Sequence, residues 1–152
     1  MAKEKVFKYV IGVLVLILSI IWIYNFKIVV IEGDSMNPTF VNGEIIIARK
    51  MPCDINKGDV IVFKIDEDIY VKRVIALGGD EVRNDEKSGI VYVNDKEVAL
   101  YKGEESGTIN NYVIPENKYF VVGDNYDVSI DSRSEKIGLI ESKDIQAVLL
   151  KK

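Results

Sequence analysis

The order of apolar and polar positions divides the chain into one long apolar segment and a body of short alternating segments. Residues 9–26 carry no charged side chain, and these 18 residues as a helix would span about 27 Å, close to the roughly 30 Å hydrocarbon core of a bilayer. A cleaved signal peptide and a buried core helix are the alternatives. The segment ends in Trp22, Tyr24 and Phe26, which are typical of a membrane interface and unlike a small-residue cleavage site. We therefore expect an uncleaved signal anchor.

The flanking charges predict how this anchor is oriented. Three lysines precede it, and positive charge is retained on the cytoplasmic side of a membrane. We expect residues 1–8 in the cytoplasm, residues 9–26 as a transmembrane anchor in the cell membrane, and residues 27–152 as an extracytoplasmic domain. Ser35 follows Tyr24 by 11 residues, which reach at most about 36 Å when extended, so Ser35 should lie near the outer membrane surface.

The body of the chain is patterned as short β-strands. Its apolar segments are short, rich in β-branched residues and separated by glycine and asparagine turns, which is typical of strands. Asn94 and Asp95 both tolerate positive φ and predict a hairpin turn. The polar residues 102–111 predict a surface loop. The strands are expected at 44–49, 59–65, 70–77, 90–93, 96–98, 118–122 and 145–150. With no helical repeat beyond the anchor, the pattern predicts a mostly β protein with an antiparallel sheet or barrel.

Composition excludes several kinds of chemistry. After residue 27 the chain holds 16 basic and 23 acidic side chains, and an acidic domain is a poor partner for nucleic acid. The chain has no histidine and a single cysteine, Cys53, so a cysteine-histidine metal site and the Ser-His-Asp and Cys-His catalytic arrangements are all excluded. We expect neither a metal nor an organic cofactor.

The polar turn at residues 33–40 directly follows the anchor and contains the candidate nucleophile, Ser35. A glycine two residues earlier bends the backbone and a proline three residues later stiffens it, although such a cluster alone is usually only a turn. Without histidine, the natural base is a lysine in apolar surroundings, because burial favours the neutral amine. Lys64 and Lys72 both lie in apolar strands, and the pattern alone does not choose between them.

A second dense polar segment, residues 123–133, follows directly on a strand. Asp131 and Arg133 are two residues apart, so extended backbone would place both on one side, where they could form an ion pair. An ordinary turn and a calcium loop are the alternatives. The segment lacks the glycine at position six and the glutamate at position twelve of an EF-hand loop, which argues against calcium.

Taken together, these segments resemble the bacterial type I signal peptidases, the membrane-anchored Ser/Lys proteases that remove signal peptides from exported proteins. The resemblance rests on the single N-terminal span and on residues 33–39, 57–63, 70–80 and 123–133, in that order. It implies the mostly β Ser/Lys-protease fold of that family. It also implies signal-peptide-bearing preproteins as substrates and the lipid bilayer as a partner.

The resemblance assigns roles to five residues. It implies that Ser35 is the nucleophile and Lys72 the general base, which resolves the choice between the two lysines. Ser129 would hydrogen-bond to the lysine amine and orient it. Asp131 and Arg133 would form a structural salt bridge beside the site.

Substrate is expected to bind as an added extended strand, with Phe40, Tyr70 and Val71 as walls of shallow pockets. Two positions depart from the family pattern. Gly33 stands where some members carry a serine that contributes to the oxyanion hole, so the hole would depend chiefly on the backbone N–H of the nucleophile. Tyr126 stands where the family commonly has arginine.

Two other functions share part of this pattern. The self-cleaving SOS-repressor type of Ser/Lys protein has the same order of nucleophile and lysine, but it would need a DNA-binding N-terminus in place of the apolar segment. A membrane-tethered β domain used only for binding is the other. Intact Ser35, Lys72, Ser129 and Asp131 argue against this second alternative, because nothing would keep these four residues together in a domain used only for binding.

Overall fold

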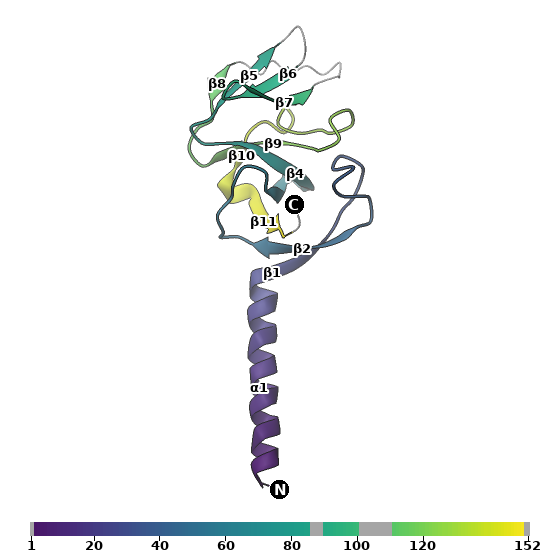
Figure 1. The fold of residues 1–152 in the computed structure, drawn as a ribbon, viewed down its shortest axis with the longest axis vertical. Coiled ribbons are helices and arrows are strands. Elements are labelled where there is room, and N and C mark those ends of the chain that lie inside the picture. Colours follow the sequence, from purple (N-terminus) through teal and green to yellow (C-terminus); the bar gives the residue numbers. More distant parts are fainter. Residues whose placement is uncertain (1, 86–89, 101–110, 151–152) are drawn as a thin grey trace.

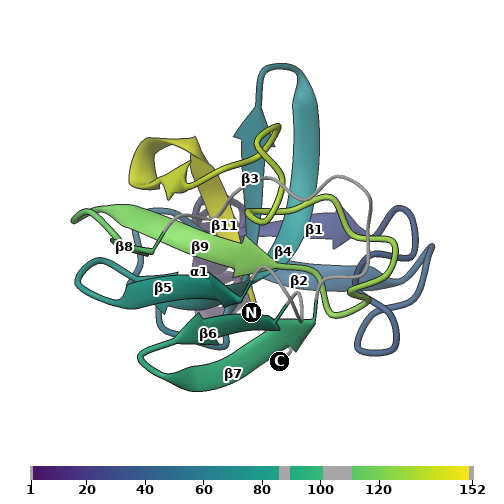
Figure 2. The ribbon, with the colours of Figure 1, turned by 90° about the horizontal axis from the view of Figure 1, so that it is seen from above.

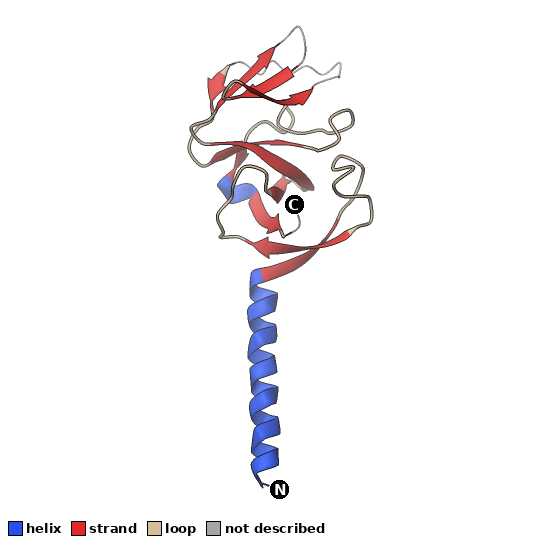
Figure 3. Cartoon of the chain, viewed as in Figure 1, coloured by secondary structure: helices blue, strands red, loops and turns tan. Residues whose placement is uncertain are grey.

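The computed structural model describes residues 2–85, 90–100 and 111–150, and it consists of one long helix and a body of β-strands (Figures 1 and 3). Helix α1 (Ala2–Asn25) stands clear of the body, and every strand pairing is antiparallel. The expected fold class, mostly β with an N-terminal apolar helix, is confirmed.

The strands form two sheets. The larger has the order β1-β2-β11-β3-β4-β9-β10 and the smaller has the order β7-β6-β5-β8, at the end of the molecule far from α1 (Figure 1). The strands are β1 (Phe26–Val30), β2 (Ile45–Lys50), β3 (Val60–Ile65), β4 (Asp68–Leu77), β5 (Glu81–Asp85), β6 (Ile90–Val93), β7 (Lys96–Leu100), β8 (Tyr112–Val113), β9 (Lys118–Val122), β10 (Ile140–Glu141) and β11 (Ile145–Leu149), with a short 3₁₀ helix at Ser142–Asp144. Seen from above, the hairpin of β3 and β4 extends beyond the rest of the sheet (Figure 2).

The helix has the length and composition of a membrane span. Lys3–Asn25 has a mean hydropathy of 2.6 in its most apolar window, and no part of that window is buried against the protein. The expected apolar segment ended at Phe26, whereas the helix ends at Asn25 and Phe26 opens β1. The chain therefore passes from helix to strand without a linker.

All seven expected strands are present, with their ends shifted by at most two residues. The hairpin turn is also confirmed, since Asn94 and Asp95 have φ values of 48° and 63°. Strands β1, β5, β8 and β10 were missed. Strand β1 continues the apolar anchor without a break in pattern, and β5 is mostly polar with Val82 as its buried apolar residue. The expected surface loop lies almost entirely outside the described residues.

Phe40 belongs to the hydrophobic core and not to a substrate pocket. Its side chain is 0% exposed and packs in a cluster with Met36 and with residues of β1, β2, β3 and β11. The expectation that Phe40 forms a pocket wall was wrong, because a large apolar ring that follows a tight turn is most stable when it is buried beneath that turn. Met36 and Phe40 together fix the turn that carries Ser35 to the sheet.

Phe40→Ala is predicted to lower the free energy of unfolding by about 3 to 5 kcal/mol, because it removes a fully buried aromatic ring and leaves a cavity. Thermal and denaturant unfolding of the detergent-solubilised chain, followed by circular dichroism, would measure the loss. Val41→Ala is the matched control, since the neighbouring Val41 side chain is exposed and its loss should change stability by no more than about 0.5 kcal/mol. Equal effects of the two substitutions would contradict the core assignment.

Candidate active site

Ser35 lies in the turn between β1 and β2, where the local hydrogen bonds hold the backbone tightly. Gly33 has a φ of 79°, a left-handed conformation that favours glycine. The Asn37 N–H donates to the Asp34 carbonyl at 3.1 Å, and the Phe40 N–H donates to the Met36 carbonyl at 2.9 Å. With Met36 and Phe40 directed into the core, Ser35 remains partly exposed at the surface of the turn.

Lys72 is buried on β4 and its amine reaches Ser35. The residue is 4% exposed, and Nζ lies 2.7 Å from Ser35 Oγ and 3.1 Å from the Val71 carbonyl oxygen. Burial lowers the pKa of Lys72 from 10.5 to about 8; the charges of Asp131 and Asp124 raise it and that of Arg133 lowers it, each less than burial does. A substantial share of this amine is therefore neutral near pH 7 to 8.

Lys64, the other candidate base, lies away from the serine. It sits near the end of β3, is about two-fifths exposed, and forms an ion pair with Glu67 at 2.9 Å. Its side chain is directed to solvent and to this carboxylate, which is the usual placement of a lysine on a strand. The structure thus brings Ser35 together with Lys72 and not with Lys64.

Asp131 and Arg133 form a buried, bidentate ion pair beside the lysine. Arg133 Nε lies 2.8 Å from Asp131 Oδ1, and Arg133 Nη2 lies 2.9 Å from Oδ2. The side chains are 0% and 2% exposed. Asp131 Oδ2 also accepts a hydrogen bond from the Gly123 N–H at 2.9 Å, so the pair ties the two ends of the polar loop together.

The same loop presses directly against the turn that carries Ser35. The Asn125 N–H donates to the Ser35 carbonyl at 3.0 Å, and Asn125 Nδ2 donates to the Asp34 carbonyl at 3.1 Å. Gly123 faces this contact, and a Cβ atom on it would lie 2.5 Å from the Ser35 carbonyl oxygen and 2.2 Å from Ser129 Oγ. Only glycine allows the loop to approach so closely.

Ser129 lies at this contact with its hydroxyl buried. Within the described residues, Ser129 Oγ has no hydrogen-bond partner, and Lys72 Nζ is directed instead to Ser35 Oγ and the Val71 carbonyl. Burial of a hydroxyl without a hydrogen-bond partner costs free energy. A hydrogen bond from Ser129 Oγ to a group that moves within reach would therefore be favourable. Its role in orienting the lysine amine stays a prediction.

Two residues at the site, Arg73 and Tyr126, make contacts that were not expected from the sequence. Arg73, on the opposite face of β4 from Lys72, holds Asp124 in a bidentate ion pair at 2.8 and 2.6 Å and donates to the Gly58 carbonyl at 2.7 Å. Tyr126 donates from its hydroxyl to the Val98 carbonyl at 3.2 Å, and its ring lies 5.6 Å from the Arg133 guanidinium carbon. For the pair of Arg73 and Asp124, the sequence offered two signals: an arginine beside the buried lysine, and an aspartate just after a strand.

A groove of about 940 Å³ begins at Ser35 and Lys72. It runs between β1 and the first half of β4, and its walls include Tyr70 and Val71, two of the three residues expected to contact substrate. The lining residues come from β1, the turn before β2, the β3–β4 hairpin and the polar loop: 27–30, 32–35, 62, 67–72, 128 and 130. In the described residues β1 ends the sheet order, and residues 68–72 of β4 pair only with β3. Both walls therefore present unpaired backbone edges.

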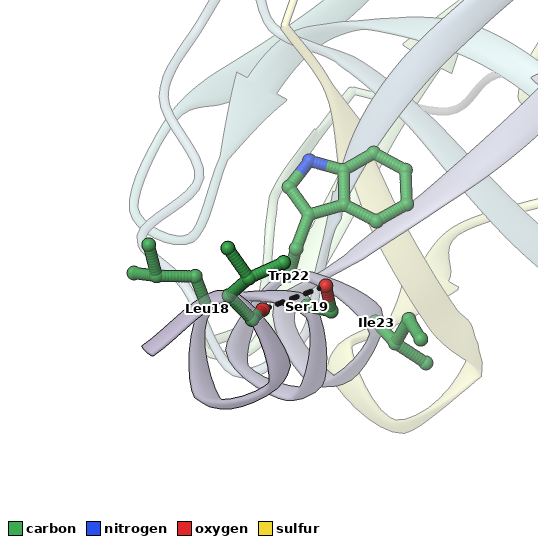
Figure 4. Close-up of a pocket in the computed structure, with 5 residues that line it drawn as sticks. Leu18, Ser19, Trp22 and Ile23 are labelled. Atoms are coloured by element: carbon green, nitrogen blue, oxygen red, sulfur yellow. Dashed lines mark hydrogen bonds between the residues drawn. The ribbon is translucent and has the colours of Figure 1, made fainter. Parts of the chain in front are cut away.

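Two other features of the chain bear on ligand binding. A hollow of about 510 Å³ lies on the outer face of α1, lined by Val15, Leu18, Ser19, Trp22 and Ile23 (Figure 4). Its one polar side chain is Ser19, whose hydroxyl donates to the Val15 carbonyl at 2.9 Å, so the hollow offers no reactive group. In the part of the chain that the structure describes, no three histidine, cysteine, aspartate or glutamate residues are grouped to hold a metal ion.

A serine hydroxyl within hydrogen-bond distance of a buried lysine, at the head of an open groove, is an arrangement suited to nucleophilic hydrolysis with an amine base. The fold and this site define a β-sheet protein with the layout of a serine hydrolase. A family model described as "Signal peptidase, peptidase S26" matches residues 4–150. The chain belongs to this family.

Individual relatives and one solved structure are similar to this chain. "Signal peptidase I P" of Bacillus subtilis subsp. natto is 34% identical over 174 residues, covering 96% of this chain and 91% of that protein. "Inactive signal peptidase IA" of Staphylococcus aureus (strain N315) is 28% identical, covering 93% of this chain and 88% of that protein. The crystal structure of a signal peptidase I from Enterococcus faecalis V583 is 22% identical with a TM-score of 0.47, covering 64% of this chain and 97% of that one.

Gly123→Ala is predicted to lower the free energy of unfolding by about 1 to 3 kcal/mol, because the added methyl group would overlap the Ser35 carbonyl and the Ser129 hydroxyl. Thermal unfolding in detergent would measure it. Gly12→Ala is a control of the same chemistry, since a Cβ at Gly12 meets nothing within 4 Å. If Gly123→Ala proved as harmless as Gly12→Ala, the close approach of loop and turn would be refuted.

Proposed function

We propose that this chain removes N-terminal signal peptides from exported preproteins at the outer membrane surface, with Ser35 as nucleophile and Lys72 as general base. Membership of the signal peptidase family supports the removal of signal peptides by a serine peptidase. The catalytic assignment rests on one observation, the 2.7 Å distance between Ser35 Oγ and the buried Lys72 Nζ. This distance allows direct proton transfer between the two groups.

Acylation uses the neutral form of Lys72. The amine takes the proton of Ser35 as Oγ attacks the carbonyl carbon at the end of the signal peptide, and the carbonyl oxygen becomes an oxyanion. The Ser35 N–H is a candidate donor to it, since it donates to no acceptor among the described residues. The tetrahedral intermediate then collapses, protonated Lys72 gives its proton to the leaving amine, and the mature protein departs.

Deacylation repeats the same proton path. Lys72, again neutral, takes a proton from a water molecule that attacks the acyl-enzyme, and it returns that proton to Ser35 Oγ as the signal peptide is released. With a pKa of about 8, about a tenth of the lysine is neutral at pH 7. Only protein groups and water take part, so the scheme requires no metal or organic cofactor.

The groove supports a substrate bound as an extended strand. The unpaired edges of β1 and of residues 68–72 of β4 both line it, and an extended peptide could satisfy them with backbone hydrogen bonds. Tyr70 and Val71 would then contact the side chains that precede the scissile bond. We expect small side chains in the part of the groove beside Ser35.

The apolar helix supports a membrane location for this chemistry. We propose that residues 1–8 lie in the cytoplasm, that the helix crosses the bilayer, and that residues 27–152 lie outside the cytoplasm. Lysines precede the span, as the positive-inside rule requires for this orientation. Anchoring the enzyme and the preprotein in one membrane raises their effective concentration.

A binding module without catalytic activity is the second candidate, because relatives named inactive align over most of the chain. The two candidates differ in one measurable property. The purified chain in detergent should cut a preprotein with a small-x-small site, and Ser35→Ala and Lys72→Ala should each lower kcat/KM by at least about 10³-fold. Lys64→Ala is the control and should retain activity. A wild-type chain that leaves the preprotein uncut would favour the binding module, and an active Lys72→Ala would refute the proposed base.

The pH dependence follows from the pKa of Lys72. Since only the neutral amine accepts a proton, kcat/KM should rise with pH, with an apparent pKa of about 8, and then reach a plateau. Below the pKa the rate should fall about tenfold per pH unit, so pH 6 should give about one hundredth of the plateau value. Cleavage of a short soluble peptide between pH 5.5 and 9.5 would measure this. A profile without a decline below pH 7 would contradict a neutral lysine base.

A further inference from the structure

Two links between helix α1 and the β body bear on the position of Ser35. The first is covalent, since α1 ends at Asn25 and β1 begins at Phe26. The second is a hydrogen bond from Lys50, at the end of β2, whose Nζ donates to the Ile23 carbonyl at 2.8 Å. The last carbonyls of a helix lack partners within the helix and carry partial negative charge, so a lysine is a favourable partner for one of them.

The strand that carries Lys50 is itself firmly held. Strand β2 pairs with β1 along its length and with β11, where Lys50 lies opposite Ala147. Lys27, at the start of β1, donates to the side-chain oxygen of Gln146 on β11 at 2.8 Å. The donor is thus fixed to the sheet and the acceptor is fixed to the helix, so the bond resists tilting of one relative to the other.

The geometry makes that tilt important for Ser35. Strand β1 leaves the end of α1 obliquely, and the Ser35 turn follows it (Figure 1). The five residues of β1 span about 16 Å at about 3.3 Å per residue. A change of about 15° in tilt would move the far end of this strand by about 4 Å, which is about one residue of extended chain.

We propose that Lys50 is a positioning residue that sets the height of Ser35 above the end of the membrane span. The enzyme would then select preproteins by the number of residues between their apolar segment and the cleavage site. This inference rests on the proposed function. The covalent joint alone would let the β body pivot about the backbone at Asn25 and Phe26, and the lysine contact restricts that freedom.

The surroundings of the bond favour such a role. The bond is exposed in the structure, and insertion of the apolar span into a bilayer, as proposed above, would reduce competition from water at this end of the span. A hydrogen bond from a charged donor is stronger than one between neutral groups. Nearby, the Trp22 and Phe26 rings lie 6.1 Å apart and Asn25 Nδ2 donates to the Ile21 carbonyl at 2.8 Å, which orders the last helical turn that presents Ile23.

The test measures two properties separately: the preference for spacer length and the rate of peptide-bond cleavage. The full chain, reconstituted in phospholipid vesicles, would be given preproteins whose spacer between the apolar segment and a small-x-small site is shortened or lengthened by one to four residues. A short soluble peptide with the same site would report the chemistry alone. Two variants remove the charged donor: Lys50→Met, which keeps the aliphatic stem, and Lys50→Gln. Lys50→Arg retains a charged donor. Lys96→Met, which changes an exposed lysine in the smaller sheet, is the control.

The wild-type chain should show a sharp optimum of spacer length. For Lys50→Met and Lys50→Gln, the ratio of kcat/KM between the best preprotein and one shifted by two residues should fall at least threefold, while soluble-peptide cleavage stays unchanged. Lys50→Arg and Lys96→Met should keep the wild-type ratio. An unchanged ratio in Lys50→Met and Lys50→Gln, an equal change in Lys96→Met, or no spacing optimum in the wild type would overturn the inference. Failure of the wild type to cut either kind of substrate would instead overturn the proposed function.

Discussion

Removal of the Lys72 amine from water is the constraint on which the rest of this site depends. Burial lowers the pKa to about 8, and it does so within hydrogen-bond distance of Ser35. A fully isolated cation at this depth would be costly, and neighbouring charges moderate the effect: Asp131 and Asp124 favour the charged form and Arg133 opposes it. Both aspartates have an arginine partner, so the lysine sits beside ion pairs whose net charge is close to zero. Burial, and not a formal charge, therefore sets its basicity.

The polar loop connects this lysine to the turn that carries the serine. Asp131 binds the start of the loop through the Gly123 N–H, and Asn125 binds the backbone of Asp34 and Ser35. Core residues hold the serine turn from the other side. The serine and the lysine come from elements far apart in sequence, yet each rests on a scaffold of buried side chains and backbone hydrogen bonds. Such preorganisation keeps the two reacting groups aligned without cost at the moment of reaction.

The sequence predicted the fold class, seven strands, one hairpin turn and the residues that now surround the site. These features have local signals: β-branched runs, a pair of residues that tolerate positive φ, and small polar clusters beside strands. Phe40 was misplaced because it ends a mostly polar turn, whereas its burial is decided by β1, β2, β3 and β11. The pattern alone did not choose between Lys64 and Lys72, since both lie in apolar strands; the family resemblance indicated Lys72, and the structure places Lys72 beside Ser35. The Arg73 and Asp124 pair spans 51 positions, and although each residue has a local signal, no local pattern shows that the two are partners.

The linker-free passage from helix to strand has a consequence for how this chain can change in length. Strand β1 continues the anchor, forms the edge of the larger sheet and lines the groove, and the serine turn follows it. One residue inserted or deleted in α1 would rotate the helix relative to the sheet. The same change in β1 would exchange its two faces, of which one carries Val29 inward and the other carries Ile28 and Val30 outward. Evolution can vary the smaller sheet without touching any of these relationships. Insertions and deletions among related chains should therefore accumulate in that sheet and be purged between the anchor and the serine.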